Sequence, residues 1–139
     1  MQQHQEEVRI ETDGRGWVEL TEHAREAVQR SGIKTGLFVA FVRHTSASLL
    51  IQENADPSVG RDLLGWLERI APDGDPRYAH SAEGPDDMPA HLRSAITSSS
   101  ETIPIVAGEL ALGTWQGLYL LEHRHASHSR RVVLHLQGA

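Results

Sequence analysis

The chain has 139 residues, of which 39 % are hydrophobic, and this suits a single domain with its own core over residues 1–139. It has no cysteine, which excludes disulfides, thiolate metal sites and a cysteine nucleophile. The net charge is -6, and the basic residues form no basic face of the kind that binds nucleic acid. No apolar run reaches the roughly 20 residues that cross a bilayer. The N-terminus lacks the basic start and apolar segment of a signal peptide. We therefore expect a cytoplasmic protein that binds neither nucleic acid nor a membrane.

The first part of the chain predicts strands around one helix. "VRIETDGRGWVEL" alternates around Asp13 and Gly14, which is typical of a β-hairpin. Thr21 is expected to cap a helix that ends at Gly32. The nearly continuous apolar run "GLFVAFVRH" predicts a strand buried on both faces, and "SLLIQEN" predicts its partner strand.

The second part predicts two further helices and the rest of a sheet. Asp56 as N-cap and Pro57 at the first helical position predict a helix over "ADPSVGRDLLGWLERIA". Its apolar stripe consists of Val59, Leu63, Leu64, Trp66, Leu67 and Ile70. An exposed loop, "PDGDPRYAHSAEG", precedes a short helix, "MPAHLRSAITSSS". "ETIPIVAG", "GLYLLEHR" and "RRVVLHLQG" complete the sheet, the last two as a hairpin. The fold class is α+β, with about three helices and a mixed, largely antiparallel, barrel-like sheet.

A group of hydroxyl side chains follows the buried strand. His44 lies where that strand ends, and Thr45, Ser46 and Ser48 come next. Hydroxyls and free backbone N–H groups at a strand end could hold a phosphate. The alternative is a tight turn whose hydroxyls satisfy local backbone groups. A nucleophile role has only a weak signal, because no G-x-S-x-G elbow is present.

The nine histidines are the unusual feature of the composition, because His and carboxylate are the strong transition-metal ligands left without cysteine. If Asp87 is the N-cap of the short helix, His91 lies four residues on, and the carboxylate can fix the tautomer of the imidazole. His80 precedes this helix and His44 lies at a strand end, so three His around an open position would resemble a catalytic zinc site. The alternative is that Asp86 or Asp87 only caps the helix and His91 is exposed.

The strand over 116–122 carries a buried acid. Both faces of this strand are apolar, so the carboxylate of Glu122 needs a partner, which Arg124 or a metal would supply. His125 and His128 fall in the turn that follows, where we expect solvated side chains. Asn54 has no structural duty in the sequence and either orients a ligand or shapes the strand exit.

These residues lie in long ordered blocks that resemble the YjbQ family of small bacterial and archaeal proteins. The blocks are "HTSASLLIQENADPSV", "EGPDDMPAHLRSAI", "SSSETIPIVAGELALGTWQGLYLLEHR" and "RRVVLHLQG", and the resemblance covers nearly the whole chain. It implies an α+β fold with a barrel-like sheet, assembled as a homotrimer. It also implies the activity of a secondary thiamine-phosphate synthase, which couples a pyrimidine pyrophosphate to a thiazole phosphate and releases pyrophosphate.

The residue chemistry and the resemblance together give the expected site residues. Catalytic roles are expected for His91, Asp87, Glu122 and Arg124, and metal ligation for His44, His80 and His91. Substrate binding is expected for Thr45, Ser46, Asn54, Asp86 and Gln116. The expected cofactor is a divalent metal, Zn or Mg, because thiamine-phosphate synthesis calls for Mg²⁺ whereas a three-His site prefers zinc. The alternatives are a zinc-dependent hydrolase of a small substrate and a non-catalytic trimeric metal- or anion-binding protein.

Overall fold

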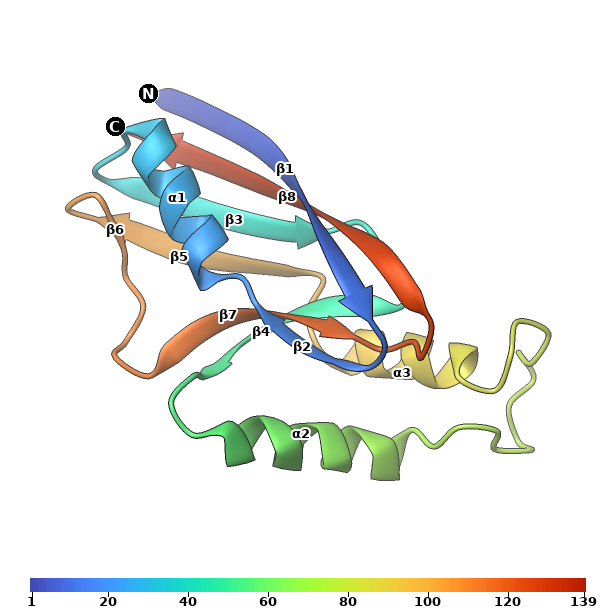
Figure 1. The fold of residues 1–139 in the computed structure, drawn as a ribbon. Coiled ribbons are helices and arrows are strands. Elements are labelled where there is room, and N and C mark those ends of the chain that lie inside the picture. The colour runs from blue at the N-terminus through green and yellow to red at the C-terminus, as the bar shows by residue number, and fades with distance from the viewer.

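The structure is a computed structural model that describes residues 1–139, with eight strands and three helices (Figure 1). The strands are β1 (Gln2–Asp13), β2 (Gly16–Glu19), β3 (Gly36–Val42), β4 (Ala47–Glu53), β5 (Ser100–Val106), β6 (Glu109–Leu110), β7 (Gln116–Glu122) and β8 (Ser127–Gly138). The helices are α1 (Thr21–Ser31), α2 (Pro57–Ile70) and α3 (Asp87–Ile96). The predicted α+β class, with a curled, barrel-like antiparallel sheet, is confirmed.

The helix ends follow local side-chain chemistry. Asp56 caps α2, because its Oδ1 accepts a hydrogen bond from the Ser58 N–H at 2.9 Å. Helix α1 ends at Gly32, whose φ of 70° places it in the left-handed region that glycine adopts without strain. The predicted cap at Thr21 is wrong. Thr21 is already helical, and its hydroxyl donates to Oε2 of Glu19 at 2.7 Å instead.

The strands form two sheets in which every pairing is antiparallel. The larger has the order β1-β8-β3-β5-β6 and the smaller the order β2-β7-β4. An isolated bridge between Leu49 and Ser98 joins the two sheets, with the Leu49 N–H donating to the Ser98 carbonyl at 2.6 Å. Figure 1 shows the larger sheet above the smaller one, so that together they enclose the core from two sides.

The two predicted hairpins are wrong, because β1 does not pair with β2 and β7 does not pair with β8. β1 pairs with β8 as far as Asp13 and Ser127, and β2 then pairs with β7 from Gly16 and Glu122. The two chain segments therefore form one long antiparallel ladder that bends at a corner and passes from the larger sheet into the smaller. Gly14 allows the bend, with a φ of 98°. Alternation around a turn does not distinguish a hairpin from a strand that changes sheet at such a corner.

The prediction for β3 also needs correction. β4 pairs with β7, not with β3, and β3 lies between β8 and β5. Phe38 is buried, whereas Leu37 and Phe41 on the other face are 40 % and 48 % exposed. The apolar run is therefore buried on one face only, and its second face is apolar at the surface of the single chain.

The core lies inside the curve of the two sheets. Ala24, Ala27 and Val28 of α1 pack there, in contact with strands of both sheets. Helix α2 runs alongside the smaller sheet (Figure 1), with Gly60 against Trp17 of β2, and Trp66 and Ile70 of its predicted apolar stripe are 47 % and 46 % exposed. None of the three helices combines the length and the apolar character that a membrane-spanning segment requires.

Candidate functional site

Four potential metal ligands converge at the start of α3. The ligating atoms of His80, Glu83, Asp87 and His91 all lie within 4.8 Å of one another. His80 and Glu83 belong to the loop before the helix, and Asp87 and His91 belong to its first turns. We call this group the α3 cluster. It contains two of the three histidines that the sequence analysis assigned to a metal.

Asp87 lies at the centre of the α3 cluster and is 3 % exposed. Its Oδ2 lies 2.6 Å from Nε2 of His80 and 3.2 Å from Nε2 of His91, and its Oδ1 accepts a hydrogen bond from Nη1 of Arg124 at 2.6 Å. Burial by itself raises the pKa of Asp87, but the hydrogen bond to His80 and the charges of His91 and Arg124 lower it below its usual value. The carboxylate is therefore ionised and able to hold a cation.

The backbone fixes the orientation of His91. Its Nδ1 lies 3.2 Å from the carbonyl oxygen of Thr45, and a carbonyl oxygen only accepts, so Nδ1 carries the proton. Nε2 then turns its lone pair toward the Asp87 carboxylate, and two facing acceptors repel unless a proton or a metal ion lies between them. A backbone carbonyl on the remote ring nitrogen is also how proteins commonly orient a metal-ligating histidine.

The donor set of the α3 cluster fits a divalent metal. Two imidazole nitrogens and two carboxylate oxygens suit zinc and its neighbours among the transition metals, whereas magnesium prefers an all-oxygen site. The hydrogen bond that His80 donates to the Asp87 carboxylate raises the pKa of His80, so protons compete with a metal for this nitrogen.

Asp86 connects the helix start to the end of β7. Asp86, one of the two acids considered for this position, is the N-cap of α3, and Asp87 is already helical. The Asp86 Oδ2 accepts hydrogen bonds from Nε of Arg124 at 3.0 Å and from the His125 N–H at 2.9 Å. The hydrogen bond to Asp86 raises the pKa of Arg124, which therefore stays charged. Arg124 and Asp86 both lie at the site, as predicted.

His44 is not part of the α3 cluster. Its Nε2 accepts a hydrogen bond from the Arg131 N–H at 2.8 Å, and its Nδ1 lies 3.5 Å from Nη1 of Arg130. Both ring nitrogens are thus directed at other groups, and burial together with the Arg130 charge lowers the pKa of His44. Ser46 likewise accepts a hydrogen bond from Nη2 of Arg130, at 3.1 Å. The turn that was expected to bind phosphate is therefore held by a hydrogen bond to β8. Thr45 contributes its carbonyl oxygen to His91, and its side chain is exposed.

Glu122 is buried and held by contacts with Arg130 and Thr12. It is 2 % exposed and forms an ion pair with Arg130 at 2.5 Å, and its Oε1 accepts a hydrogen bond from the Thr12 hydroxyl at 2.5 Å. Burial raises its pKa, but these hydrogen bonds outweigh burial and lower the pKa overall. The partner predicted for Glu122 was the Arg124 side chain or a metal. The actual partner is Arg130, and Arg124 contributes only its backbone N–H, at 3.1 Å.

Asn54 and Gln116 lie away from the α3 cluster. β4 and β7 are antiparallel, so Glu53 pairs with Gln116 at one end while Ala47 pairs with Glu122 at the other. The Oε1 of Gln116 accepts a hydrogen bond from the Gly113 N–H at 2.7 Å, which holds the local turn. The structure therefore does not bring these two predicted substrate-binding residues to the site.

Two residues of this region were missed by the sequence reasoning. Glu83 had been placed in an exposed loop, although it precedes Asp87 by the same four residues that separate Asp87 from His91, a spacing that could have indicated it. Arg130 gave no local signal, because its partner Glu122 is in a different sheet and the corner between the sheets brings them together.

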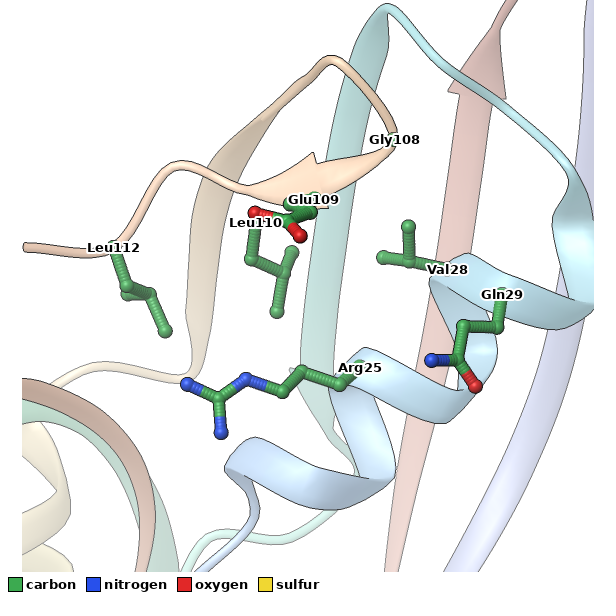
Figure 2. A pocket seen from close by; sticks show the side chains of 7 residues that line it. All are labelled: Arg25, Val28, Gln29, Gly108, Glu109, Leu110 and Leu112. Atoms are coloured by element: carbon green, nitrogen blue, oxygen red, sulfur yellow. The ribbon is translucent and has the colours of Figure 1, made fainter.

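Two cavities lie on different sides of the molecule. One of about 360 Å³ adjoins the α3 cluster at His80 and is lined by Gly74, Asp75, Pro76, Tyr78, His80, Ser81, Gly84 and Pro85. A second of about 370 Å³ lies between α1 and the turn from β5 to β6, where Figure 2 shows side chains of the helix facing Leu110 and Leu112. This second cavity has no histidine among its lining residues. The first is the one that can serve the cluster.

The fold and the α3 cluster define an α+β protein with a candidate divalent-metal centre built from two histidines and two carboxylates. A family model described as "UPF0047 protein YjbQ-like" matches residues 6–139. The chain belongs to the YjbQ (UPF0047) family, and the resemblance seen in the sequence is confirmed.

Curated relatives and solved structures agree with this assignment. The chain is 54 % identical over 136 residues to the UPF0047 protein sll1880 of Synechocystis sp., covering 98 % of this chain and 92 % of that protein. It is 42 % identical over 106 residues to the UPF0047 protein YjbQ of Escherichia coli O157:H7, covering 76 % of each. A solved structure of an uncharacterized YjbQ/UPF0047 protein from Clostridium acetobutylicum aligns with a TM-score of 0.87 and 37 % identity, covering 94 % of this chain and 98 % of that one.

Proposed function

We propose that this protein is a divalent-metal-dependent enzyme that acts on a small phosphorylated substrate, with secondary thiamine-phosphate synthesis as the named form expected from the family resemblance. One observation carries the proposal. The ligating atoms of His80, Glu83, Asp87 and His91 converge within 4.8 Å, and the backbone of Thr45 turns Nε2 of His91 toward them.

The residues around the cluster support a role with a phosphorylated ligand. A divalent ion held by the α3 cluster would supply Lewis acidity toward phosphate oxygens and lower the pKa of a water molecule. Arg124 holds Asp86 and Asp87 in place, and its side chain remains 21 % exposed, so part of the guanidinium can reach an anion. The N-terminus of α3 adds a partial positive charge. The cavity of about 360 Å³ beside His80 has room for a small substrate.

Proton transfer by Glu122 has no support in this arrangement. Its carboxylate is bound by Arg130 and Thr12 inside the corner between the sheets. The residues that remain for contact with a substrate are those of the α3 cluster and Arg124.

A second candidate is zinc-dependent hydrolysis of a small substrate. The donor set favours it, since two imidazole nitrogens prefer zinc to the magnesium that pyrophosphate chemistry commonly uses. The two activities would use the same residues and differ in the metal and in the group that attacks.

The test is turnover by protein loaded separately with Zn²⁺ and with Mg²⁺. Formation of thiamine phosphate from the pyrimidine pyrophosphate and the thiazole phosphate supports the first function if it is lost in His91→Ala. Metal-dependent hydrolysis of phosphate esters with the same dependence supports the second. His23→Ala, which changes an exposed histidine of α1, is the control and should retain full turnover. Tight metal binding without turnover on either substrate set would leave the non-catalytic metal-binding role.

The homotrimer expected from the family resemblance is part of the proposal. The exposed apolar face of β3, with Leu37 and Phe41, is consistent with burial in an assembly. Light scattering should then give three times the chain mass of 15.4 kDa. A mass of one chain would refute the assembly without affecting the metal proposal.

A further inference from the structure

A third cavity, of about 290 Å³, lies between the smaller sheet and the N-terminus of α2. It is lined by Trp17, Glu19, Glu53, Asn54, Asp56, Pro57 and Tyr119. Glu53 lies at the end of the β4–β7 pair that is opposite to Glu122, and Tyr119 lies at the middle of the pair. The cavity is therefore separate from the site described above, and no part of the proposed function uses it.

The cavity has three carboxylates and no cationic lining residue. Glu19 and Glu53 use one oxygen each within the protein, with Oε2 of Glu19 accepting from the Thr21 hydroxyl and Oε2 of Glu53 accepting from the Asp56 N–H at 3.3 Å. Their Oε1 atoms have no such partner. Asp56 is the cap of α2, and Arg61 is the cation that acts on it. The potential in the cavity is negative and selects a cation.

Tyr119 gives a second, independent indication of a ligand. Its side chain is 5 % exposed and lines the cavity, yet its hydroxyl makes no hydrogen bond to either carboxylate. Burial, followed by the charges of Glu19 and Glu53, raises the pKa of Tyr119, so the hydroxyl stays neutral. The hydroxyl has no protein partner and reaches the open space of the cavity, so it is available to a ligand there.

Trp17 and Tyr119 are the aromatic residues that line the cavity. The rings of Trp17 and Tyr119 stack with centroids 4.0 Å apart and an angle of 13°. The indole also lies against Gly60, where an added Cβ would come within 2.1 Å of Cζ2 of Trp17. The indole thus contacts both Tyr119 and Gly60, and its stacked face is closed to a ligand. A ligand of this cavity then depends mainly on hydrogen bonds to oxygen atoms.

A bare metal ion fits this cavity poorly. The carboxylates of Glu19, Glu53 and Asp56 do not form a group with ligand atoms within 4.8 Å of one another, whereas the α3 cluster does. Hydrogen bonds from an ammonium nitrogen are longer than metal–oxygen bonds, so an organic ammonium suits oxygens that are spaced too widely for a bare ion.

We propose that this cavity binds a small organic cation bearing a primary ammonium group, which donates to the carboxylates of Glu19 and Glu53 and to the hydroxyl oxygen of Tyr119. A primary ammonium carries three donors and no acceptor, which matches three oxygen acceptors.

The experiment is a calorimetric titration of the full chain with 1,4-diaminobutane at low ionic strength, with tetramethylammonium and Mg²⁺ titrated at equal ionic strength. The diamine should bind at one site per chain, and the affinity should fall as salt rises. Tetramethylammonium, which has no N–H donor, should bind at least about tenfold more weakly. Equal binding of all three cations would show only general attraction to an acidic surface and overturn the proposal.

Two conservative variants locate the site. Glu53→Gln removes one charge, and Tyr119→Phe removes one oxygen without changing the ring; each should weaken diamine binding about fivefold. Glu109→Gln, at the cavity near α1, removes an equal charge elsewhere and should leave the affinity unchanged. Circular dichroism checks that each variant is folded. Folded Glu53→Gln and Tyr119→Phe proteins with unchanged affinity, or an equal loss in Glu109→Gln, would refute the assignment.

Discussion

Nε2 of His91 lies 3.2 Å from Oδ2 of Asp87 and is turned toward it by a contact on the other side of the ring, from Nδ1 to the carbonyl of Thr45. This relationship connects α3 to the turn between β3 and β4, which contains Thr45. It is also the geometry on which the proposed metal site depends. One ring nitrogen is held by the backbone, and the other is presented to an ionised carboxylate.

The first prediction concerns the charge of Asp87. Asp87→Asn keeps the shape of the side chain but removes the negative charge, so we expect zinc affinity to fall by at least about tenfold. Competition with a chromogenic chelator measures this. Asp62→Asn, on the exposed side of α2, is the matched control and should bind zinc as the parent does. Equal affinity in Asp87→Asn would show that Asp87 is not a ligand.

A second prediction separates Glu122 from the site. Arg130→Met would leave the Glu122 carboxylate buried without its partner and should cost about 3–5 kcal/mol in the free energy of unfolding. Arg131→Met removes an exposed pair with Glu7 and should cost less than about 1 kcal/mol. Urea denaturation compares the two. Similar losses would contradict the structural role of Glu122, as would loss of zinc binding in a folded Arg130→Met protein.

The third prediction is a pH dependence that arises from His123. Burial, with a contribution from the Arg93 charge, lowers the pKa of His123 to about 3, and its Nε2 lies 2.8 Å from the Ser48 hydroxyl. Below the unfolded pKa of about 6.5 the unfolded chain takes up a proton that the folded protein does not. Stability should therefore fall as pH drops from about 6.5 toward 3, by about 1.4 kcal/mol per pH unit from this group.

His123→Gln tests that slope. The variant should be less stable at pH 7, because Ser48 loses its partner, but it should lose less stability on acidification. Urea denaturation between pH 7 and pH 4 gives both quantities. An unchanged slope would mean that His123 titrates normally in the folded protein.

The fourth prediction uses two glycines of α2. Alanine favours a helix interior by about 1 kcal/mol over glycine, so Gly65→Ala, where the nearest atom to an added Cβ is at 3.6 Å, should stabilise the protein. Gly60→Ala would place its Cβ 2.1 Å from Cζ2 of Trp17 and should destabilise the protein despite the same propensity gain. Thermal unfolding with tryptophan fluorescence reports both. Stabilisation by both changes would contradict the packing of Trp17 under α2.

Local signals in the sequence predicted most elements correctly. The cap at Asp56 and the glycine at Gly32 marked helix ends because each acts on its own neighbours. Strand pairing was predicted poorly, since alternation around Asp13 and Gly14 describes a turn but not which sheet receives the next strand. The pairing is decided by contacts between β1, β2, β7 and β8, which lie far apart in the chain.

The candidate site could be predicted where its residues lie close together in the sequence, but not where distant segments meet. His80, Asp87 and His91 lie within one short stretch, and the sequence brought them together correctly. His44 was assigned to the same site through the family resemblance, and the fold instead directs its ring to Arg130 and Arg131. Sequence spacing cannot establish which strand end reaches the start of a helix.

The most direct test of the central claim is the zinc content of protein purified without chelators, measured beside His91→Ala and His23→Ala. We expect about one zinc per chain in the parent and in His23→Ala, and loss of the metal in His91→Ala, because His91 belongs to the α3 cluster and His23 does not. Zinc retained equally in all three proteins, or a parent that binds no divalent metal even when it is supplied, would contradict a metal site at the start of α3.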